Sequence, residues 1–366
     1  MPSRARLLFA ALLAAFSFCT SRGGVLAASD SCRDVVQEYV RFHNAHRGAA
    51  GAQYLIYECK QYCNGGLGDR VRGILFLLRV AITHRRVLLV NWTEPFPLEE
   101  VFDGAEVNWS VPPELDASSV KHFNFYQNYG TDAFNSSMRE LQSLLDSGSS
   151  SSSAAALSIY TNLWIDVEVD ASLLRPLARL ESKHRTCWFN ALFKPTARLK
   201  HEISSELSRM GVADKRSYAA AHLRLGGQEG EDIVLDRADR FEAENAVLHC
   251  ARRLAAAHDL QTASPVVLVT DNRILRFVIA RGYLAGVVGP SGVASHIVLG
   301  SHAHKAAFKS FVELGVLGNA ACLVKSRSGF SEVAAWWSGT VCVTTVEACT
   351  AELRELTHSK GDESAG

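Results

Sequence analysis

The sequence predicts an α/β protein built on a doubly wound parallel sheet. Two observations support this fold class, and the length bounds the number of domains. A glycine turn leads into a helical pattern and then into the unbroken apolar run Val87–Val90, which is typical of a strand buried on both faces. Strand-like and helix-like segments alternate from residue 217 to 343, the pattern of a parallel sheet. The length of 366 residues fits one large or two medium domains.

The first unit begins with the glycine-rich turn Cys63–Gly73. From Val71 onward, apolar residues recur every three or four positions, which is the period of one helix face. His84, Arg85 and Arg86 end this helix, because the negative helix terminus favours cations. Glycines before a helix let backbone N–H groups approach an anion. The turn is therefore a candidate anion site, and a plain turn before a core helix is the alternative.

The remainder of the N-terminal part carries weaker signals. The expected elements are a short helix at 35–42, loops over 100–145, one or two strands at 157–169 and a helix at 190–210. The serine-rich stretch 147–153 predicts an exposed loop. Scattered aromatic residues are interpreted as core rather than as the lining of an acceptor groove. These residues are Phe123, Phe125, Tyr126 and Tyr129.

Beyond Lys215 the expected strands and helices alternate regularly. The strands are expected at 217–224, 266–271, 321–324 and 341–343, and the helices at 241–258, 274–281, 308–317 and after Ser331 through Trp337. Ligands of such sheets bind beyond the carboxyl ends of the strands. We divide the chain into domains 29–212 and 213–350, followed by a tail at 351–366.

The N-terminus predicts a targeting segment over residues 1–28. Arg4 and Arg6 precede an apolar run at 7–18, which is short for a membrane span and typical of a signal peptide. Small residues near Ala27 fit a cleavage site, and an uncleaved single-pass type II signal anchor is the alternative. We therefore expect entry into the secretory pathway, with residence in the Golgi or endoplasmic reticulum lumen or secretion. The glycosylation sequons that agree with this location begin at Asn91, Asn108 and Asn135.

Charge and cysteine content narrow the function classes. Lys plus Arg and Asp plus Glu number 38 each, so no global charge draws the chain to nucleic acid or to an anionic membrane. Membrane contact is expected only through the leader. Cysteines beyond the leader can form up to four disulfides in an oxidising lumen, and no pair has zinc-finger spacing, so we reject a zinc site. The acidic alternation Asp166–Asp170 is interpreted as an amphipathic edge strand rather than a metal motif.

The strand that ends at Arg224 carries the first candidate site. His222 and Arg224 point to the same side of a strand, and Gly226 and Gly227 let the chain turn away. An arginine fork suits a diphosphate, because two N–H groups can bind two oxygens. Acids follow that could restrain the arginine, act as a base or form a surface salt-bridge cluster. They are Glu229, Glu231 and Asp232.

Two more candidate groups follow later strands. Asp271 ends the strand at 266–270, where its carboxylate can accept hydrogen bonds from a purine or a ribose, or cap the next helix. The segment Ser326–Glu332 opens a helix, where hydroxyl and N–H groups can cradle an anion. Ordinary capping by Ser328 or Ser331 is compatible with that role.

Four segments in order, GGLGDR, HLRLGG, LVTDN and SGFSEVAAWW, resemble the GDP-fucose-dependent fucosyltransferase superfamily of inverting α1,2-, α1,6- and protein O-fucosyltransferase types. The resemblance covers residues 60–92 and 217–340. It implies the GT-B fold, with two Rossmann-like halves and a cleft between them, the N-terminal half on the acceptor side and the C-terminal half binding the nucleotide sugar. It also implies GDP-fucose as donor, a glycan or glycoprotein as acceptor, and neither metal nor other cofactor.

The resemblance assigns roles to the matching residues. Arg224 would bind the β-phosphate and help the departing diphosphate, His222 would position Arg224, and Asp271 would hold guanine or ribose. The residues that would shape the nucleotide-facing loop are Gly66, Gly68, Asp69 and Arg70. Those that would contact the diphosphate are Ser328, Gly329, Phe330 and Ser331.

The sequence departs from the family pattern at two positions. Asp69 replaces the usual asparagine, and Gly227 stands where an acid is usual. The candidate catalytic residues are therefore Arg224 and, as the base, Glu229 or Glu231. Two other functions stay open, namely a GT-B transferase for another nucleotide sugar and a secreted sugar-binding protein on a degenerate transferase fold.

Overall fold

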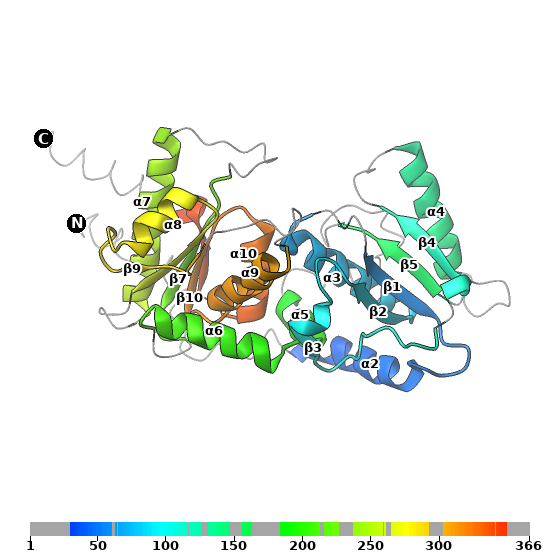
Figure 1. Ribbon diagram of the computed structural model, residues 1–366. Coiled ribbons are helices and arrows are strands. Elements are labelled where there is room, and N and C mark those ends of the chain that lie inside the picture. Colours follow the sequence, from blue (N-terminus) through cyan, green and yellow to red (C-terminus); the bar gives the residue numbers. More distant parts are fainter. Residues whose placement is uncertain are drawn as a thin grey trace, which may run out of the picture.

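The protein contains two parallel sheets that lie on either side of a helical middle (Figure 1). A computed structural model describes residues 30–60, 63, 65–115, 117–125, 131–146, 156–162, 184–212, 216–226, 237–258, 260, 265–292, 303–340 and 342–349. All strand pairings within both sheets are parallel, which confirms the predicted fold class. The leader, the serine-rich loop, Asp166–Asp170 and the tail lie outside the described residues.

The first sheet has the strand order β2-β1-β5-β4. Its strands are β1 (Tyr54–Cys59), β2 (Val87–Trp92), β4 (Val120–Asn124) and β5 (Ala156–Tyr160). β2 confirms the strand predicted from the apolar run. β1 is an addition to the prediction, and its residues pair with β2 in register from Tyr54 opposite Val87 to Cys59 opposite Trp92.

Helices of the first half supply the core that covers one face of this sheet. They are α2 (Asp30–His46), α3 (Leu67–His84) and α4 (Asp132–Asp146). The prediction of loops over 100–145 is wrong at β4 and α4. α4 forms because its buried residues Phe134, Met138, Leu141 and Leu145 recur at helical spacing. Phe123 and Phe125 are buried, as expected of core residues, whereas Tyr126 and Tyr129 lie outside the described residues.

The second sheet has the strand order β11-β10-β7-β8-β9. Its strands are β7 (Ala219–Leu223), β8 (Val266–Thr270), β9 (Val287–Val288), β10 (Cys322–Lys325) and β11 (Val343–Thr345). The small residues of β7 are all buried, and this central strand pairs with both β8 and β10. Its carboxyl end therefore lies between the carboxyl ends of two neighbours, which brings the three predicted strand-end groups to one edge.

The helices of the second half surround this sheet. They are α7 (Arg237–Ala257), α8 (Arg273–Ala280), α9 (Ala303–Gly318) and α10 (Gly329–Ser338). α6 (Ala197–Arg209) belongs to the segment 29–212 in sequence but packs against α9 of the second half. The two helices cross closely, since a Cβ on Gly315 would lie 2.1 Å from Cδ1 of Ile203.

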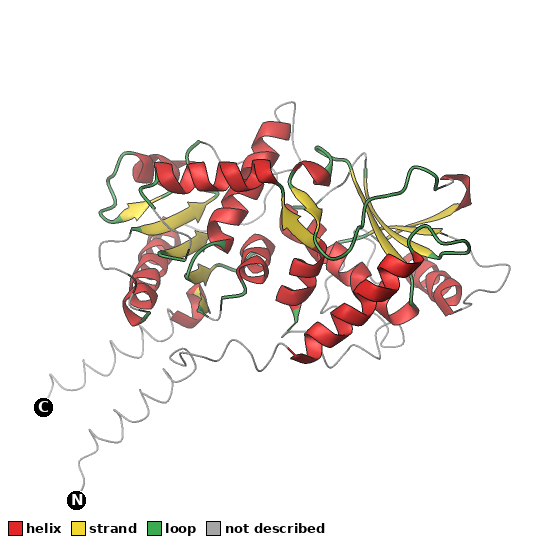
Figure 2. Ribbon diagram, turned by 90° about the horizontal axis from the view of Figure 1, so that it is seen from below, coloured by secondary structure: helices red, strands yellow, loops and turns green. Residues whose placement is uncertain are grey.

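A small antiparallel pair, β3 (Phe102–Gly104) with β6 (Phe193–Pro195), lies between the two sheets (Figure 2). The helix α5 (Arg185–Leu192) leads into β6, and the short 3₁₀ turns η1 (Leu98–Glu100) and η2 (Ala117–Ser119) complete the described elements. Aromatic rings tie this middle to the second half. The Phe102 ring centroid lies 5.8 Å from that of Phe311 and 5.3 Å from that of Trp337. One apolar core therefore runs through both halves.

Disulfides join sequence-distant and local segments, as the even cysteine count predicts. The bonds are Cys59–Cys63, Cys250–Cys349 and Cys322–Cys342, and Cys187 is also disulfide-bonded. Cys250–Cys349 links α7 to the residues that follow β11. Within the part of the chain that the structure describes, no helix combines the length and apolar character needed to cross a membrane.

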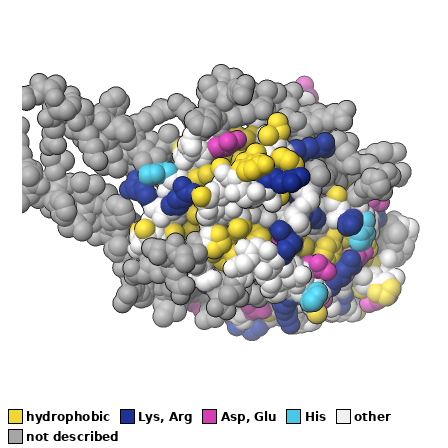
Figure 3. All heavy atoms as spheres, turned by 60° about the vertical axis from the view of Figure 1, so that its left-hand side comes forward, with side chains coloured by type: hydrophobic (Ala, Val, Ile, Leu, Met, Phe, Trp, Pro, Cys, Tyr) yellow, Lys and Arg dark blue, Asp and Glu magenta, His cyan; other side chains and the backbone are white. Residues whose placement is uncertain are grey.

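α8 and the turn that follows it present large apolar side chains to solvent. Ile274, Phe277 and Tyr283 are all more than half exposed, and the Arg281 guanidinium lies 5.2 Å from the Phe277 ring centroid. Figure 3 shows apolar side chains among Lys and Arg on the face of the molecule that carries the second half. Since α8 begins two residues after Asp271, this exposed helix lies beside the carboxyl edge of the second sheet.

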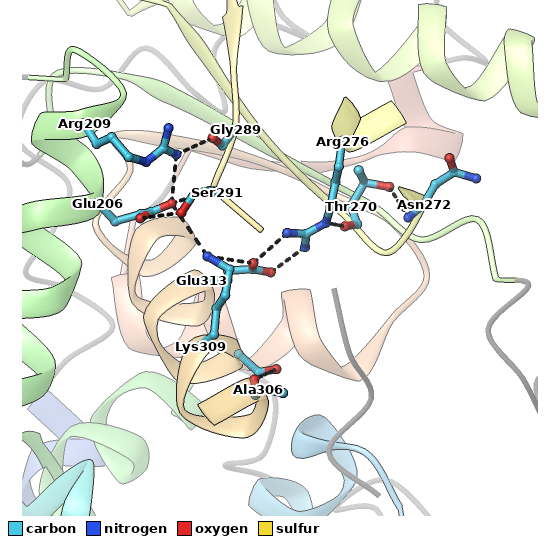
Figure 4. Close-up of polar contacts among 11 residues, drawn as sticks. Glu206, Arg209, Thr270, Asn272, Arg276, Gly289, Ser291, Ala306, Lys309 and Glu313 are labelled. Atoms are coloured by element: carbon cyan, nitrogen blue, oxygen red, sulfur yellow. Dashed lines mark hydrogen bonds and ion pairs between the residues drawn. The ribbon is translucent and has the colours of Figure 1, made fainter. Parts of the chain in front are cut away.

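A polar network ties α6, α8 and α9 together (Figure 4). Arg276 forms a buried bidentate pair with Glu313, with distances of 2.8 and 2.7 Å, and donates through Nε to the carbonyl of Thr270 at the end of β8. Lys309 Nζ lies 3.8 Å from both Glu313 and Glu206. The network therefore fixes α8 and α9 relative to the carboxyl end of β8.

Removing Arg276 alone is expected to destabilise the protein strongly. In Arg276→Met, Glu313 stays buried, and among the described residues Lys309, at 3.8 Å, is the cation that still pairs with it. Breaking a buried ion pair in this way costs about 3–5 kcal/mol of stability. Arg276→Met combined with Glu313→Leu should cost much less, because no buried carboxylate is left. Urea unfolding of both variants measures this, and equal losses of stability would contradict the expectation.

Candidate functional site

The first and third candidate groups meet at the carboxyl ends of β7 and β10. The two strands pair in parallel with His222 opposite Lys325, so the residues that follow each strand are neighbours. The backbone N–H of Arg224 donates to Ser326 Oγ at 3.2 Å. The Arg224 side chain is half-buried at this edge. The parallel register therefore places Arg224, the residue predicted to bind a diphosphate, beside the start of α10.

His222 is buried beneath this edge. Its Nδ1 lies 3.0 Å from Ser326 Oγ, and its ring centroid lies 5.3 Å from that of Phe330. Burial, and then repulsion by Arg224 and Arg276, lowers the pKa of His222 to about 3. The ring is therefore neutral at physiological pH. Since Ser326 Oγ accepts from Arg224, its own proton is available to Nδ1, which favours the His222 tautomer protonated at Nε2.

The neutral state of His222 predicts a pH effect on stability. The ordinary pKa of 6.5 applies in the unfolded chain, so between about pH 6.5 and 3 the unfolded state binds one more proton than the folded state. The free energy of unfolding should therefore fall as the pH drops through this range. His222→Asn should remove that part of the slope. Urea unfolding near pH 7 and pH 5 tests this, and an unchanged slope in the variant would contradict it.

Asp271 holds the turn that follows β7. Its Oδ1 accepts from the backbone N–H of Leu225 at 2.9 Å, and its Oδ2 accepts from Gly226 at 3.0 Å. The alternative that Asp271 caps the next helix is wrong, because Asn272 is the cap of α8 and accepts from Leu275 at 2.9 Å. Both carboxylate oxygens thus serve the turn that presents Arg224.

The start of α10 is organised by its own serines. Ser328 caps the helix and accepts from the Phe330 backbone N–H at 3.3 Å. Ser331 is fully buried, and its hydroxyl donates to the carbonyls of Ser326 and Ser328 at 3.0 and 3.1 Å. The hydroxyls of Ser328 and Ser331 thus fix the turn and the cap at the start of α10, the role that the sequence analysis gave as compatible with contacts to a diphosphate.

The glycine turn of the first half is held from inside by Arg70. This buried guanidinium donates to the carbonyls of Cys63 and Glu94, at 2.6 Å each, and of Gly65 at 3.1 Å. It also lies 5.1 Å from the Trp92 ring centroid. Arg70 therefore holds the turn from inside the protein, through three backbone carbonyls.

Asp69 and Gly66 form the N-terminal cap of α3. The backbone N–H of Gly66 donates to Asp69 Oδ2 at 3.2 Å, which is the half of a capping box that needs no side chain on the N-cap residue. The Asp69 side chain is about one third exposed. The Asp69 carboxylate therefore closes the start of the helix.

The start of α3 lies directly against the start of α10. A Cβ on Gly68 would lie only 2.4 Å from the carbonyl carbon of Gly329, so the two backbones touch. Next to this contact, Arg72 of α3 pairs with Glu332 of α10, and the two helices lie next to each other between the sheets (Figure 1). The glycine turn of the first half and the serine turn of the second half therefore lie next to each other.

Sequence reasoning missed Arg72 and the role of Glu332. The residues Arg70 and Arg72 are two positions apart, which puts them on different sides of a helix. That spacing indicates that only one of the two arginines can face the glycine turn. The partner of Arg72 lies in the other half of the chain, so no local pattern identifies it.

The structure describes the three sequon asparagines but not the predicted base. Glu229, Glu231 and Gly227 lie outside the described residues. Asn108 and Asn135 are exposed, and Asn91 is partly exposed near the end of β2, which leaves all three asparagines accessible to some degree.

One group of described residues has the spacing of metal ligands. It consists of His258, Cys322 and Cys342, which bring one ligand atom each to within 4.8 Å of the others. The two cysteines form a disulfide, so they offer no thiolate to a metal ion. The group also lies at the amino end of β10, away from the strand ends that carry the candidate site.

The fold defines the class. Two parallel α/β halves that touch at the starts of α3 and α10 make a fucosyltransferase-like fold of the GT-B class. No family model matches the sequence, and no curated protein matches it either.

Solved structures provide the comparison. An arginine-to-lysine mutant of Arabidopsis thaliana FUT1 in complex with GDP is similar with a TM-score of 0.55 and 14% sequence identity. The similarity covers 85% of this chain and 78% of that chain. POFUT1 in complex with GDP-fucose is similar with a TM-score of 0.46 and 13% identity, over 81% of this chain and 98% of that one. At 14% identity the likeness to FUT1 establishes the fold and not the reaction.

Proposed function

We propose that the protein transfers fucose from GDP-fucose to a glycan or glycoprotein acceptor, with inversion and without a metal ion. One observation carries the proposal: the Arg224 turn, held by Ser326 and Asp271, lies beside the helix start at Gly329, which touches the glycine turn at Gly68. A cation and two helix N-termini that meet in one place suit a diphosphate. The comparison structure of FUT1, which contains GDP, agrees with this class of donor.

The proposed chemistry rests on charge that develops on the departing diphosphate. Groups that are fixed before the reaction stabilise such charge more in the transition state than in the ground state. In this proposal the Arg224 guanidinium and the N–H groups at the start of α10 bind the diphosphate oxygens, and neutral His222 supports Arg224 through Ser326. Glu229 deprotonates the acceptor hydroxyl. The segment 29–212 presents the acceptor, and 213–350 binds the donor.

The proposal includes a cellular setting. The protein acts in the lumen of the Golgi or endoplasmic reticulum or is secreted, with its leader either cleaved or kept as an anchor. The disulfides agree with an oxidising compartment. The sequons Asn91, Asn108 and Asn135 are proposed glycosylation sites.

A thermal-shift panel tests the donor class directly. GDP and GDP-fucose should raise the melting temperature of the purified, secreted protein, since a ligand that binds only the folded state stabilises it by mass action. UDP and UDP-sugars should have no such effect, and EDTA should not change the result for GDP. A fucose-transfer assay on glycan and glycoprotein acceptors follows.

Each other result assigns a different function. Stabilisation by UDP derivatives alone would indicate a transferase for another nucleotide sugar. A folded protein that binds none of the nucleotides would favour the non-catalytic, sugar-binding alternative. Loss of the GDP effect in EDTA would contradict the metal-independent form of the proposal.

A further inference from the structure

Arg72 lies where the two halves of the site touch. It is buried in the second turn of α3 with 5% exposure, and its Nη2 forms an ion pair with Glu332 in the first turn of α10. Its Nη1 lies 3.5 Å from Asp69 Oδ1 in the first turn of α3 itself. One guanidinium thus bridges a carboxylate from each of the two helix starts.

The backbone of α10 leaves no space between itself and this guanidinium. A Cβ on Gly329 would lie 2.9 Å from the guanidinium carbon of Arg72 and 3.0 Å from Nη1. The carbonyl of the same residue touches Gly68. The first residue of α10 is therefore in close contact with both the start of α3 and the Arg72 side chain.

The electrostatics of this contact require a compensating charge. Each helix start carries about half a positive charge, and Arg72 adds a full one, so bringing them together is unfavourable by itself. Asp69 and Glu332 supply two negative charges and offset this local sum. An arginine that pairs with both carboxylates therefore holds the two helix starts together.

We propose that Arg72 is a positioning residue for the donor diphosphate. It clamps the start of α10 to the start of α3 through Glu332, so that the N–H groups of both helices and the Arg224 turn surround the same diphosphate. Arg72 acts through α10 and does not contact the donor itself. This inference rests on the proposed function, which supplies the diphosphate.

The test separates binding of the diphosphate from binding of the nucleoside. GDP, guanosine and inorganic pyrophosphate are titrated by calorimetry or competition against the wild type, Arg72→Gln and Glu332→Gln. We expect both variants to lose about tenfold or more in affinity for GDP and pyrophosphate, as when a charge-assisted contact is lost, and to keep the affinity of the wild type for guanosine. The double variant should be no weaker than the single ones, because all three break the same clamp.

Matched controls exclude a general effect on the fold. Arg85→Gln removes another ion pair of the same helix region, with Glu38, but on the exposed surface, and should change no affinity. Arg72→Lys keeps the charge but cannot bridge two carboxylates with a planar fork, and it should show the loss of diphosphate affinity in a folded protein even if Arg72→Gln fails to fold.

The outcomes distinguish this inference from the proposed function. Equal loss of guanosine and GDP affinity, or no loss of either, in the folded Arg72 variants would overturn the clamp. If the wild type binds pyrophosphate but no guanine nucleotide, the donor assignment fails while pyrophosphate still tests the clamp. If the wild type binds neither, there is no diphosphate to position and both proposals fail.

Discussion

Arg224→Ala is expected to reduce the rate of the proposed fucosyl transfer by about 100- to 1,000-fold, the usual effect of removing one fixed contact to developing charge. The arginine side chain stands on a turn that Ser326 and Asp271 hold through its backbone. Truncation of the side chain therefore leaves the turn in place. The loss should appear in kcat as well as in kcat/KM, because the contact strengthens as the diphosphate departs.

Secretion, melting temperature and transfer rate measured together check this expectation. Arg281→Ala is the matched control. Arg281 is an exposed arginine at the end of α8, and its guanidinium lies over the Phe277 ring. It should transfer fucose at the rate of the wild type. Near-normal transfer by a folded Arg224→Ala protein would remove Arg224 from the mechanism.

Gly68→Ala should disrupt both donor binding and stability. In an ordinary helix this change is favourable by up to about 1 kcal/mol, because alanine has the higher helix propensity. Here the new methyl group would lie 2.4 Å from the Gly329 carbonyl carbon, a backbone atom that cannot rotate away. The starts of α3 and α10 must separate, which is expected to cost about 1–3 kcal/mol of stability and at least about tenfold in GDP affinity.

A second glycine separates the two effects. Gly282 has φ of +71° and open space around its Cβ position, so Gly282→Ala strains the backbone without a clash and lies outside the candidate site. It should lower stability while GDP affinity stays at the level of the wild type. If Gly68→Ala and Gly282→Ala have the same effect on GDP affinity, the contact between the helix starts has no role in binding.

The parts of the site that depend on strand order were predictable from the sequence. The apolar run 266–270 places Asp271 at a strand end, and the parallel alternation places Arg224 and Ser328 at the same edge. This follows because all carboxyl ends of a parallel sheet lie on one side. The helix that follows the glycine turn was equally predictable, since its apolar period runs unbroken from Val71 to Ala81.

The partners of these side chains were not predictable. Asp271 serves backbone N–H groups of another loop, and Ser331 serves carbonyls of its own turn, because loop geometry decides which groups lie within hydrogen-bond distance. Sequence spacing cannot state that geometry. The contact of Arg72 with Glu332 joins residues 260 positions apart. β4 and α4 were missed because the loop signals around them outweighed four apolar residues at helical spacing.

The shape of the glycine turn depends on the Cys59–Cys63 disulfide, and therefore on the oxidation state of these two cysteines. It staples the last residue of β1 to the residue whose carbonyl receives the Arg70 guanidinium. Reducing agents such as dithiothreitol would therefore loosen the turn at its base. Purification in non-reducing buffer is consequently part of any fair assay of this protein, and bacterial cytosol is a poor host for producing it.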